Sequence, residues 1–151
     1  MRYSHTQHAP LHYFLLAVST AMLIAALSAH AAAFVYYVLL CAAAMVFLFA
    51  LSFQWLKVED AGDRLSIRYG WLPLFGKQIR YEEMTAVERG KTSLIDGWGI
   101  HWVPGRGWTY NLWGFDCVRL AVGERTIRVG SDDAANLAAF LKTKIGTDRD
   151  G

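Results

Sequence analysis

Charge is missing from the N-terminal part of this sequence. Between Arg2 and Lys57 there is no Asp, Glu, Lys or Arg, and all 13 acidic residues lie from Glu59 onward. A segment of a water-soluble fold normally carries charged residues on its exposed side, so this block is not the core segment of a globular domain. The chain therefore divides into one region suited to lipid and one suited to water.

Cysteine is scarce, and positive charge is not concentrated. The only two cysteines are Cys41 and Cys117, one in each region, so no disulfide framework is expected. From Lys57 onward there are 14 basic and 13 acidic residues, which leaves a surplus of one. Nucleic-acid surfaces need clustered positive charge, so no nucleic-acid partner is expected. Arg89 and Lys91 are too few to predict a lipid head-group site.

The uncharged block is long enough to cross a bilayer twice, since one crossing needs about 20 apolar residues. We place the spans at about 11–28 and 34–55, with residues 29–33 as the turn. That turn contains neither Gly nor Pro, so length rather than turn chemistry requires the break. Region 1–56 is thus expected to be a transmembrane helical hairpin, with the lipid bilayer as its first partner.

Lys and Arg near the span ends predict the orientation, because positive residues are retained in the cytoplasm. Arg2 precedes the first span, and Lys57, Arg64 and Arg68 follow the second, whereas the turn has no positive residue. We therefore expect a multi-pass protein of the cell inner (cytoplasmic) membrane with both termini in the cytoplasm.

A cleaved signal peptide is the alternative for residues 1–31. Ala29, His30 and Ala31 have the small-x-small form of a cleavage site. Against this alternative, the segment before the apolar stretch has a single Arg, and the apolar stretch is slightly longer than that of a usual signal peptide.

Alanine recurs at every fourth position of the first span. Ala17, Ala21 and Ala25 begin this stripe, which on a helix forms a smooth line that another helix can approach closely. We expect the second span of the same chain to pack there. The alternative is a homo-oligomer formed through the same stripe, in which the chain acts as a self-associating structural anchor.

After Leu56 the sequence changes to short alternating segments separated by Gly and Pro, which is typical of successive antiparallel strands. Pro104-Gly105 and Val122-Gly123-Glu124 mark hairpin turns. The expected strands are about 64–69, 75–81, 85–89, 98–103, 108–112, 117–122 and 126–129.

One amphipathic helix should end the chain. Ser131 or Asp132 can cap its first amides, and Leu137 and Leu141 lie on one apolar face. Region 57–151 is therefore expected to be a mainly β soluble domain closed by a C-terminal helix.

About seven antiparallel strands followed by one C-terminal helix is the arrangement of a pleckstrin-homology-like (PH-like) bent barrel. Several segments resemble those of small bacterial membrane proteins with a PH-like domain. They are Trp98-Gly-Ile-His-Trp, Gly107-Trp-Thr-Tyr-Asn-Leu-Trp-Gly, Val118-Arg-Leu and Ile127-Arg-Val-Gly-Ser-Asp-Asp. The resemblance implies a membrane-anchored binding or scaffolding module, for example an accessory subunit of a larger membrane complex that docks another membrane or cytoplasmic protein. It implies no particular ligand-contact residues.

Aromatic residues are the most unusual feature of the β region. We expect Trp108 and Tyr110 to fill the core, since a small domain needs large side chains to bury enough area. Trp102 and Trp113, together with Arg106 in a turn, are the candidate interface for a partner.

Candidate catalytic and metal-binding residues are few. Cys117 with His101 in a neighbouring strand could form an activated thiol, and an enzyme using Cys117 is the less favoured interpretation. His5, His8 and His12 have no nearby Cys, Asp or Glu to complete a metal site. We expect no catalysis, no metal and no cofactor.

Overall fold

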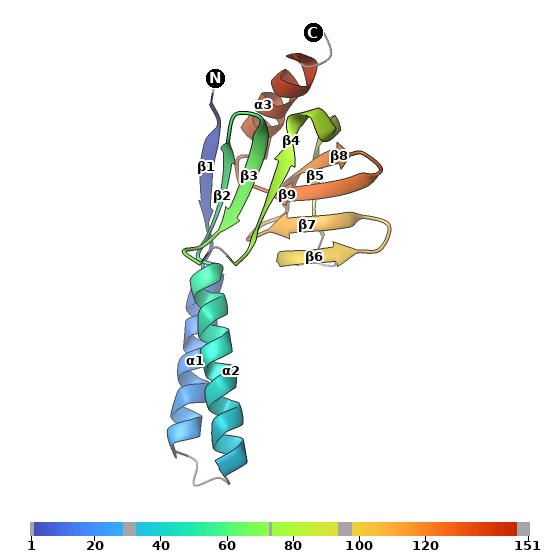
Figure 1. Ribbon diagram of the computed structural model, residues 1–151. Coiled ribbons are helices and arrows are strands. Elements are labelled where there is room, and N and C mark those ends of the chain that lie inside the picture. The colour runs from blue at the N-terminus through green and yellow to red at the C-terminus, as the bar shows by residue number, and fades with distance from the viewer. Residues whose placement is uncertain (1, 29–32, 73, 94–97, 148–151) are drawn as a thin grey trace.

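The computed structural model describes residues 2–28, 33–72, 74–93 and 98–147 of the 151-residue chain. Two long helices stand side by side under a mainly β domain, and a third helix lies on the far side of that domain (Figure 1). The long helices are α1 (Leu11–Ser28) and α2 (Ala33–Ser52). Both are long and apolar enough to cross a membrane, which agrees with the expected spans, although α2 ends at Ser52 rather than at residue 55.

Small residues join the two long helices. Ser19 and Ala26 of α1 and Ala43 and Ala50 of α2 are buried. The Ser19 hydroxyl donates a hydrogen bond to the carbonyl oxygen of Ala43 at 2.9 Å. The buried positions recur every seventh residue in each helix, so they stay on one line along a closely packed helix pair.

The helical pair is inserted between two neighbouring strands. β1 (Ser4–His8) precedes α1, and β2 (Trp55–Asp60) follows α2. The two strands pair antiparallel, with Ser4 opposite Glu59 and His8 opposite Trp55. Residues 4–8 fall in the expected membrane region, for which the sequence predicts no strand. Their pairing with β2 brings both outer ends of the helical pair to the same sheet.

The first sheet is an antiparallel meander. β3 (Arg64–Tyr69) and β4 (Gly76–Arg80) follow β2, and the order is β1-β2-β3-β4. Leu56 and Val58 on β2 and Leu65 and Ile67 on β3 are fully buried, as the alternation of apolar residues predicts. A short 3-10 helix, η1 (Tyr81–Glu83), leads out of this sheet.

The second sheet contains β5 (Met84–Lys91), β6 (Gly99–Val103), β7 (Gly107–Asn111), β8 (Asp116–Val122) and β9 (Arg125–Gly130). Its order is β5-β8-β9-β7-β6. The strands of both sheets include all seven expected from the sequence, and both expected hairpin turns are present.

Two features of the β domain differ from the expected barrel of antiparallel strands. β7 and β9 pair in parallel. β9 forms an antiparallel hairpin with β8 and lies between β8 and β7 in the sheet. In the part of the chain that the structure describes, the strands form two separate sheets and do not close into a barrel.

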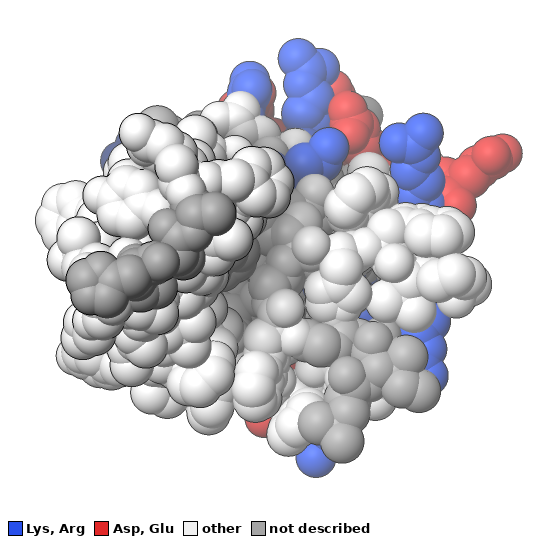
Figure 2. Space-filling view, turned by 90° about the horizontal axis from the view of Figure 1, so that it is seen from below, with Lys and Arg blue, Asp and Glu red and all other residues white. Residues whose placement is uncertain are grey.

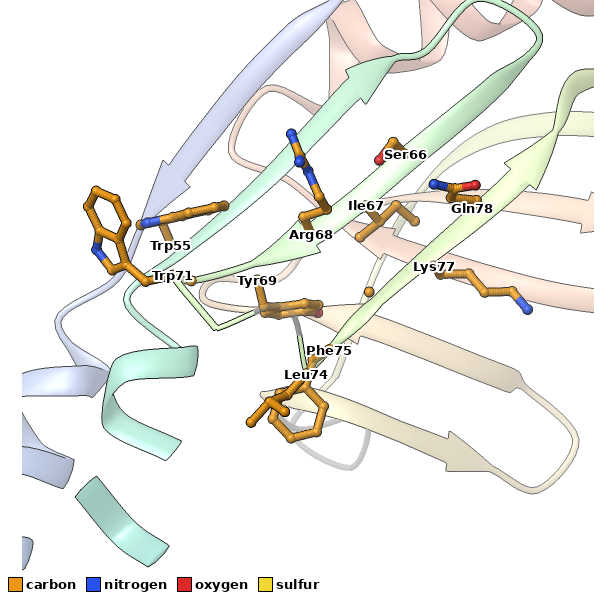
Figure 3. Close-up of a pocket in the computed structure, with 12 residues that line it drawn as sticks. Trp55, Ser66, Ile67, Arg68, Tyr69, Trp71, Leu74, Phe75, Lys77 and Gln78 are labelled. Atoms are coloured by element: carbon orange, nitrogen blue, oxygen red, sulfur yellow. The ribbon is translucent and has the colours of Figure 1, made fainter. Parts of the chain in front are cut away.

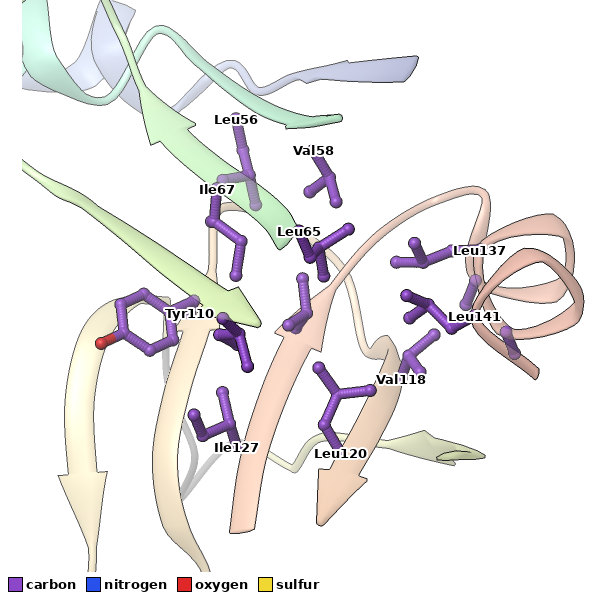
Figure 4. Close-up of a cluster of buried hydrophobic side chains, with 14 of the residues drawn as sticks. Leu56, Val58, Leu65, Ile67, Tyr110, Val118, Leu120, Ile127, Leu137 and Leu141 are labelled. Carbon is purple, nitrogen blue, oxygen red and sulfur yellow. The ribbon is translucent and has the colours of Figure 1, made fainter. Parts of the chain in front are cut away.

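The core lies between the two sheets and is closed by α3 (Ala134–Thr147). Figure 4 shows Leu137 and Leu141 reaching from α3 toward Val118 and Leu65, which come from different sheets. At the start of α3 the Ser131 hydroxyl accepts a hydrogen bond from the backbone N–H two residues later, at 3.0 Å. The helix was predicted from the sequence, whereas the Ser131 hydroxyl bonds to Asp133 just before α3 rather than to the first amides of the helix.

Candidate functional site

Aromatic rings join the end of α2 to the turn between β3 and β4. The ring centroid of Phe75 lies 6.0 Å from that of Phe49 and 5.5 Å from that of Phe53. Phe53 also contacts Tyr69, with 5.4 Å between centroids. The turn is therefore packed along the last helical turn of α2 rather than above it.

Gly70 fixes the same contact through the backbone. It has a φ of +48°, and an added Cβ would overlap the carbonyl oxygens of Leu51 and Ser52 at the end of α2. Its N–H donates a hydrogen bond to the carbonyl oxygen of Trp55 at 2.9 Å. Only glycine permits this approach, so the β domain and α2 are held together at a defined position.

The turn exposes large apolar side chains next to the helix end. Trp71 is 76% exposed and Leu74 is 63% exposed. We call Trp55, Trp71, Leu74 and Phe75 the junction surface. They border a groove of about 460 Å³, and Figure 3 shows the two tryptophans at one end, Leu74 and Phe75 at the other, and Tyr69 between them. Burial raises the pKa of the Tyr69 hydroxyl well above its ordinary value.

Trp113, one member of the expected partner surface, lies near the same end of the domain. Its ring stacks on Trp98, with 4.4 Å between centroids, and the two side chains are partly exposed. Gln7 of β1 donates a hydrogen bond to the Trp113 carbonyl oxygen at 2.9 Å. Seen from below the helices, the charged side chains of the described residues lie toward the edges of the domain (Figure 2).

Trp102 lies apart from Trp113, at the other end of β6. It is opposite Trp108 in the pairing of β6 with β7, and it borders a hollow together with Trp108 and Arg106. Trp108 is 43% exposed, so the expectation that it fills the core is not met, whereas Tyr110 is buried as expected. The structure thus brings Trp102 and Arg106 together but places Trp113 elsewhere.

Arg106 also borders a second hollow of different chemistry. We call this hollow of about 310 Å³ the basic pocket, and it is lined by Gly90, Lys91, Arg106, Cys117, Arg119 and Arg128. No local pattern in the sequence connects these residues, because they lie on three strands and a turn that only the fold brings together.

Cys117 and His101 are not brought together. Cys117 on β8 is buried, and β9 and β7 separate it from His101 on β6. Three strand spacings correspond to about 14 Å between backbones. No direct hydrogen bond can join the two side chains across that distance, so the pair does not form an activated thiol.

The N-terminal histidines make separate contacts. His5 Nε2 lies 2.5 Å from Asp132 Oδ1, which connects β1 to the segment before α3, and His12 Nδ1 lies 2.7 Å from the carbonyl oxygen of Ala9. His8 is exposed at the end of β1. Among the described residues, no group of three or more His, Cys, Asp and Glu side chains is placed to hold a metal ion.

The alanine stripe does not pack against the second helix. Ala17, Ala21 and Ala25 are exposed in the described chain. The expectation that α2 lies on them is not met, because α1 is turned so that Ser19 and Ala26 face α2 instead.

Asp60 connects β2 to the far end of the domain. Its carboxylate accepts hydrogen bonds from the Tyr81 hydroxyl at 2.8 Å and the Gly62 N–H at 2.9 Å, and it lies 3.2 Å from Lys144 Nζ on α3. Burial on its own would raise the pKa of Asp60, but these contacts outweigh burial and hold the pKa below its ordinary value of 3.8.

Two surfaces of the β domain therefore combine exposure with distinctive chemistry. The junction surface is apolar and belongs to the first sheet, and the basic pocket is cationic and belongs to the second. Similarity assigns a role to neither surface, since no known family model matches this chain and no curated protein is significantly similar to it.

Proposed function

We propose that this protein is a membrane-anchored binding module whose β domain rests against the membrane through the junction surface. The stacking of Phe75 on Phe49 carries the proposal. Phe49 lies three residues before the end of α2, or about 4.5 Å along the helix axis. Leu74, next to Phe75, is thus held near the depth of the last helical turn, and the Trp71 ring contacts Trp55 just beyond that turn. Tryptophan favours this depth in a bilayer, because its ring is buried while its N–H stays in water.

A helical hairpin with two crossings is the proposed anchor. Residues 4–8 and 55–60 are hydrogen-bonded neighbours, so they must lie on one side of the bilayer if α1 and α2 cross it. Removal of a signal peptide ending near residue 31 would delete β1, including the buried Gln7 side chain. Positive residues follow α2, and the turn between the helices has none. These observations support an inner-membrane, multi-pass protein with both termini in the cytoplasm.

We also propose that the β domain is PH-like and serves as a scaffold, for example in an accessory subunit that docks another membrane or cytoplasmic protein. A four-stranded meander, a second sheet and the closing helix α3 support this relationship. The parallel pairing of β7 with β9 departs from it. Binding is favoured over catalysis by Cys117 because β9 and β7 separate that thiol from His101, the base expected for it.

The depth of the junction surface can be measured directly. A spin label is attached to Leu74→Cys in a Cys41→Ala background, with the full chain in lipid nanodiscs, and collision with oxygen is compared with collision with a water-soluble nickel complex. The matched control is Glu82→Cys in η1, whose side chain is exposed at the far end of the domain. Cys117 is buried and does not compete for the label.

We expect the label at position 74 to collide mainly with oxygen and the label at position 82 mainly with the nickel complex. Equal access of the nickel complex to both labels would overturn the membrane-resting proposal. If the nickel complex reached the label at position 74 in nanodiscs but not in native membranes, a protein partner would cover this position instead of lipid.

The exposed stripe of Ala17, Ala21 and Ala25 favours one alternative, a self-associating anchor. Light scattering of the detergent-solubilised chain distinguishes the two functions. A dimer that Ala21→Leu converts to a monomer would support self-association, whereas a monomer in both cases would remove it.

A further inference from the structure

We propose that the basic pocket binds the phosphate group of a small anionic ligand. The pocket lies on the outer face of the second sheet, since Arg119 and Arg128 alternate along their strands with the buried core residues Val118 and Val129. This inference goes beyond the membrane-anchoring role. It concerns the outer face of the second sheet, whereas the junction surface belongs to the first sheet, and it does not depend on the depth of the junction surface in the membrane.

Gly90 forms part of the pocket wall beside Cys117. Cys117 on β8 is flanked in the sheet register by Gly90 on β5 and by Gly130 on β9. A Cβ on Gly90 would stand 3.6 Å from the Cys117 sulfur, so a larger side chain there would begin to fill the pocket floor. The absence of a side chain on Gly90 leaves space above the Cys117 sulfur, whereas the Asn111 side chain fills the corresponding space beside Gly130.

The guanidinium groups around this hollow are held in place before a ligand binds. Arg119 and Arg128 are direct cross-strand partners, and like charges in that position destabilise a sheet. Glu88 contacts Arg119 at 3.1 Å, and the Arg106 carbonyl oxygen accepts a hydrogen bond from Arg128. A bound anion between the two guanidinium groups would relieve their repulsion.

The charge of the pocket matches a phosphate monoester. Four basic side chains line it, and no acidic side chain does among the described residues; Glu88 and Asp116 lie opposite Arg119 and Lys91 in the sheet register. A phosphate monoester carries about −1.5 to −2 at neutral pH. Guanidinium groups bind phosphate through paired N–H donors, and a hollow of about 310 Å³ admits one phosphate with a small substituent.

This chemistry has two sources, a soluble phosphate ester or the head group of phosphatidic acid. Glycerol 3-phosphate represents both, so we would titrate it by calorimetry into the full chain in phosphatidylcholine nanodiscs. Parallel titrations use nanodiscs that also contain phosphatidic acid or, as the phosphodiester control, phosphatidylglycerol. The variants are Arg128→Gln and Lys91→Gln, with Arg64→Gln on the first sheet as the control for loss of one positive charge.

We expect saturable binding that Arg128→Gln weakens about tenfold or more, since one charge-assisted contact is lost. Lys91→Gln should weaken binding less, and Arg64→Gln should leave it unchanged. If phosphatidic acid occupies the pocket, glycerol 3-phosphate should bind more weakly only in the nanodiscs that contain phosphatidic acid, and this result would identify a lipid head group as the ligand. Equal binding in all three kinds of nanodisc would identify a soluble phosphate ester.

The proposal would be overturned if the native chain showed no saturable binding of glycerol 3-phosphate in any nanodisc. It would also be overturned if Arg64→Gln weakened binding as much as Arg128→Gln. Circular dichroism of each variant checks the fold. Lys91 makes no ion pair within the described chain, so Lys91→Gln keeps the test decisive if Arg128→Gln does not fold.

Discussion

The two sheets of the β domain are held in place in different ways. The first sheet is continuous with both long helices, and Gly70 and Phe75 pack its β3–β4 turn onto the end of α2. The second sheet joins the first mainly through the shared core and α3, and its outer face carries the basic pocket. The two proposals, attachment through the first sheet and ligand binding by the second, therefore concern different sheets of one small domain, and a substitution in one sheet can be compared with a substitution in the other.

Gly70→Ala should have the largest effect, because it separates the first sheet from the end of α2. A Cβ at this position overlaps two backbone carbonyl oxygens that cannot move without displacing the helix. We expect a loss of about 3 kcal/mol in the free energy of unfolding, measured by circular dichroism of the detergent-solubilised chain. Gly62→Ala is the control, because Gly62 also has a positive φ but open space around it, and should lose only about 1 kcal/mol. Equal losses would mean that the close approach contributes nothing.

Gly107→Ala tests the second sheet in the same way. Here a Cβ would overlap the carbonyl oxygen of Thr126, next to the parallel contact between β7 and β9. We expect a loss of about 2 kcal/mol in the free energy of unfolding, with the packing of the two long helices unchanged. Gly105→Ala in the same turn has a positive φ and open surroundings, so it should be milder. A similar loss in both variants would show that backbone conformation alone matters at this turn.

Asp60→Asn tests the connection between the first sheet and α3. The pKa of Asp60 is lowered in the folded chain, so its contribution is complete above pH 3.8 and is lost as the pH falls through the lowered value. We expect Asp60→Asn to cost about 1 kcal/mol near pH 7 and progressively less below pH 3.8, by thermal unfolding at a series of pH values. Asp63→Asn, in an exposed pair with Arg64, should change stability little. A constant difference between Asp60→Asn and the native chain at every pH would contradict the assignment.

Ser19→Ala should have the smallest effect, since it removes one hydrogen bond between the long helices and leaves both sheets untouched. Such bonds within a membrane contribute about 0.6 kcal/mol. Unfolding of the chain by added sodium dodecyl sulfate in mixed micelles measures the loss. Thr20→Ala is the control, because the Thr20 hydroxyl bonds to Leu16 within its own helix. If Thr20→Ala were the more costly change, the contact between Ser19 and Ala43 would not join the helices.

Local patterns predicted the seven strands from β3 onward, their two hairpin turns and α3, because each depends on neighbouring residues. β1 was missed because its partner β2 comes only after both long helices and because Ser4–His8 is almost entirely polar. The parallel contact of β7 with β9 was missed for a similar reason, since β8 lies between them in the sequence. Long-range pairing of this kind leaves no periodic signal in the chain.

The residues of the candidate sites could likewise be predicted only where they depend on neighbouring positions in the sequence. Arg119 and Arg128 could have been placed opposite each other, because the predicted Val122–Glu124 turn sets the register of its hairpin. Lys91 and Arg106 had no such signal. Trp71 and Leu74 lie in a turn, and only the contact of Phe75 with Phe49 shows that this turn reaches the end of a long helix.

The pairing of β1 with β2 also bears on how the chain is made. β1 leaves the ribosome before its partner β2, which follows only after both long helices have been synthesised. If one helix crossed the bilayer and the other did not, the two strands would be on opposite sides and the first sheet would keep an unpaired edge at β2. An unpaired edge strand favours aggregation. With the proposed topology, completion of the sheet depends on correct insertion of both helices, and a misinserted chain would lack the native domain and remain open to degradation.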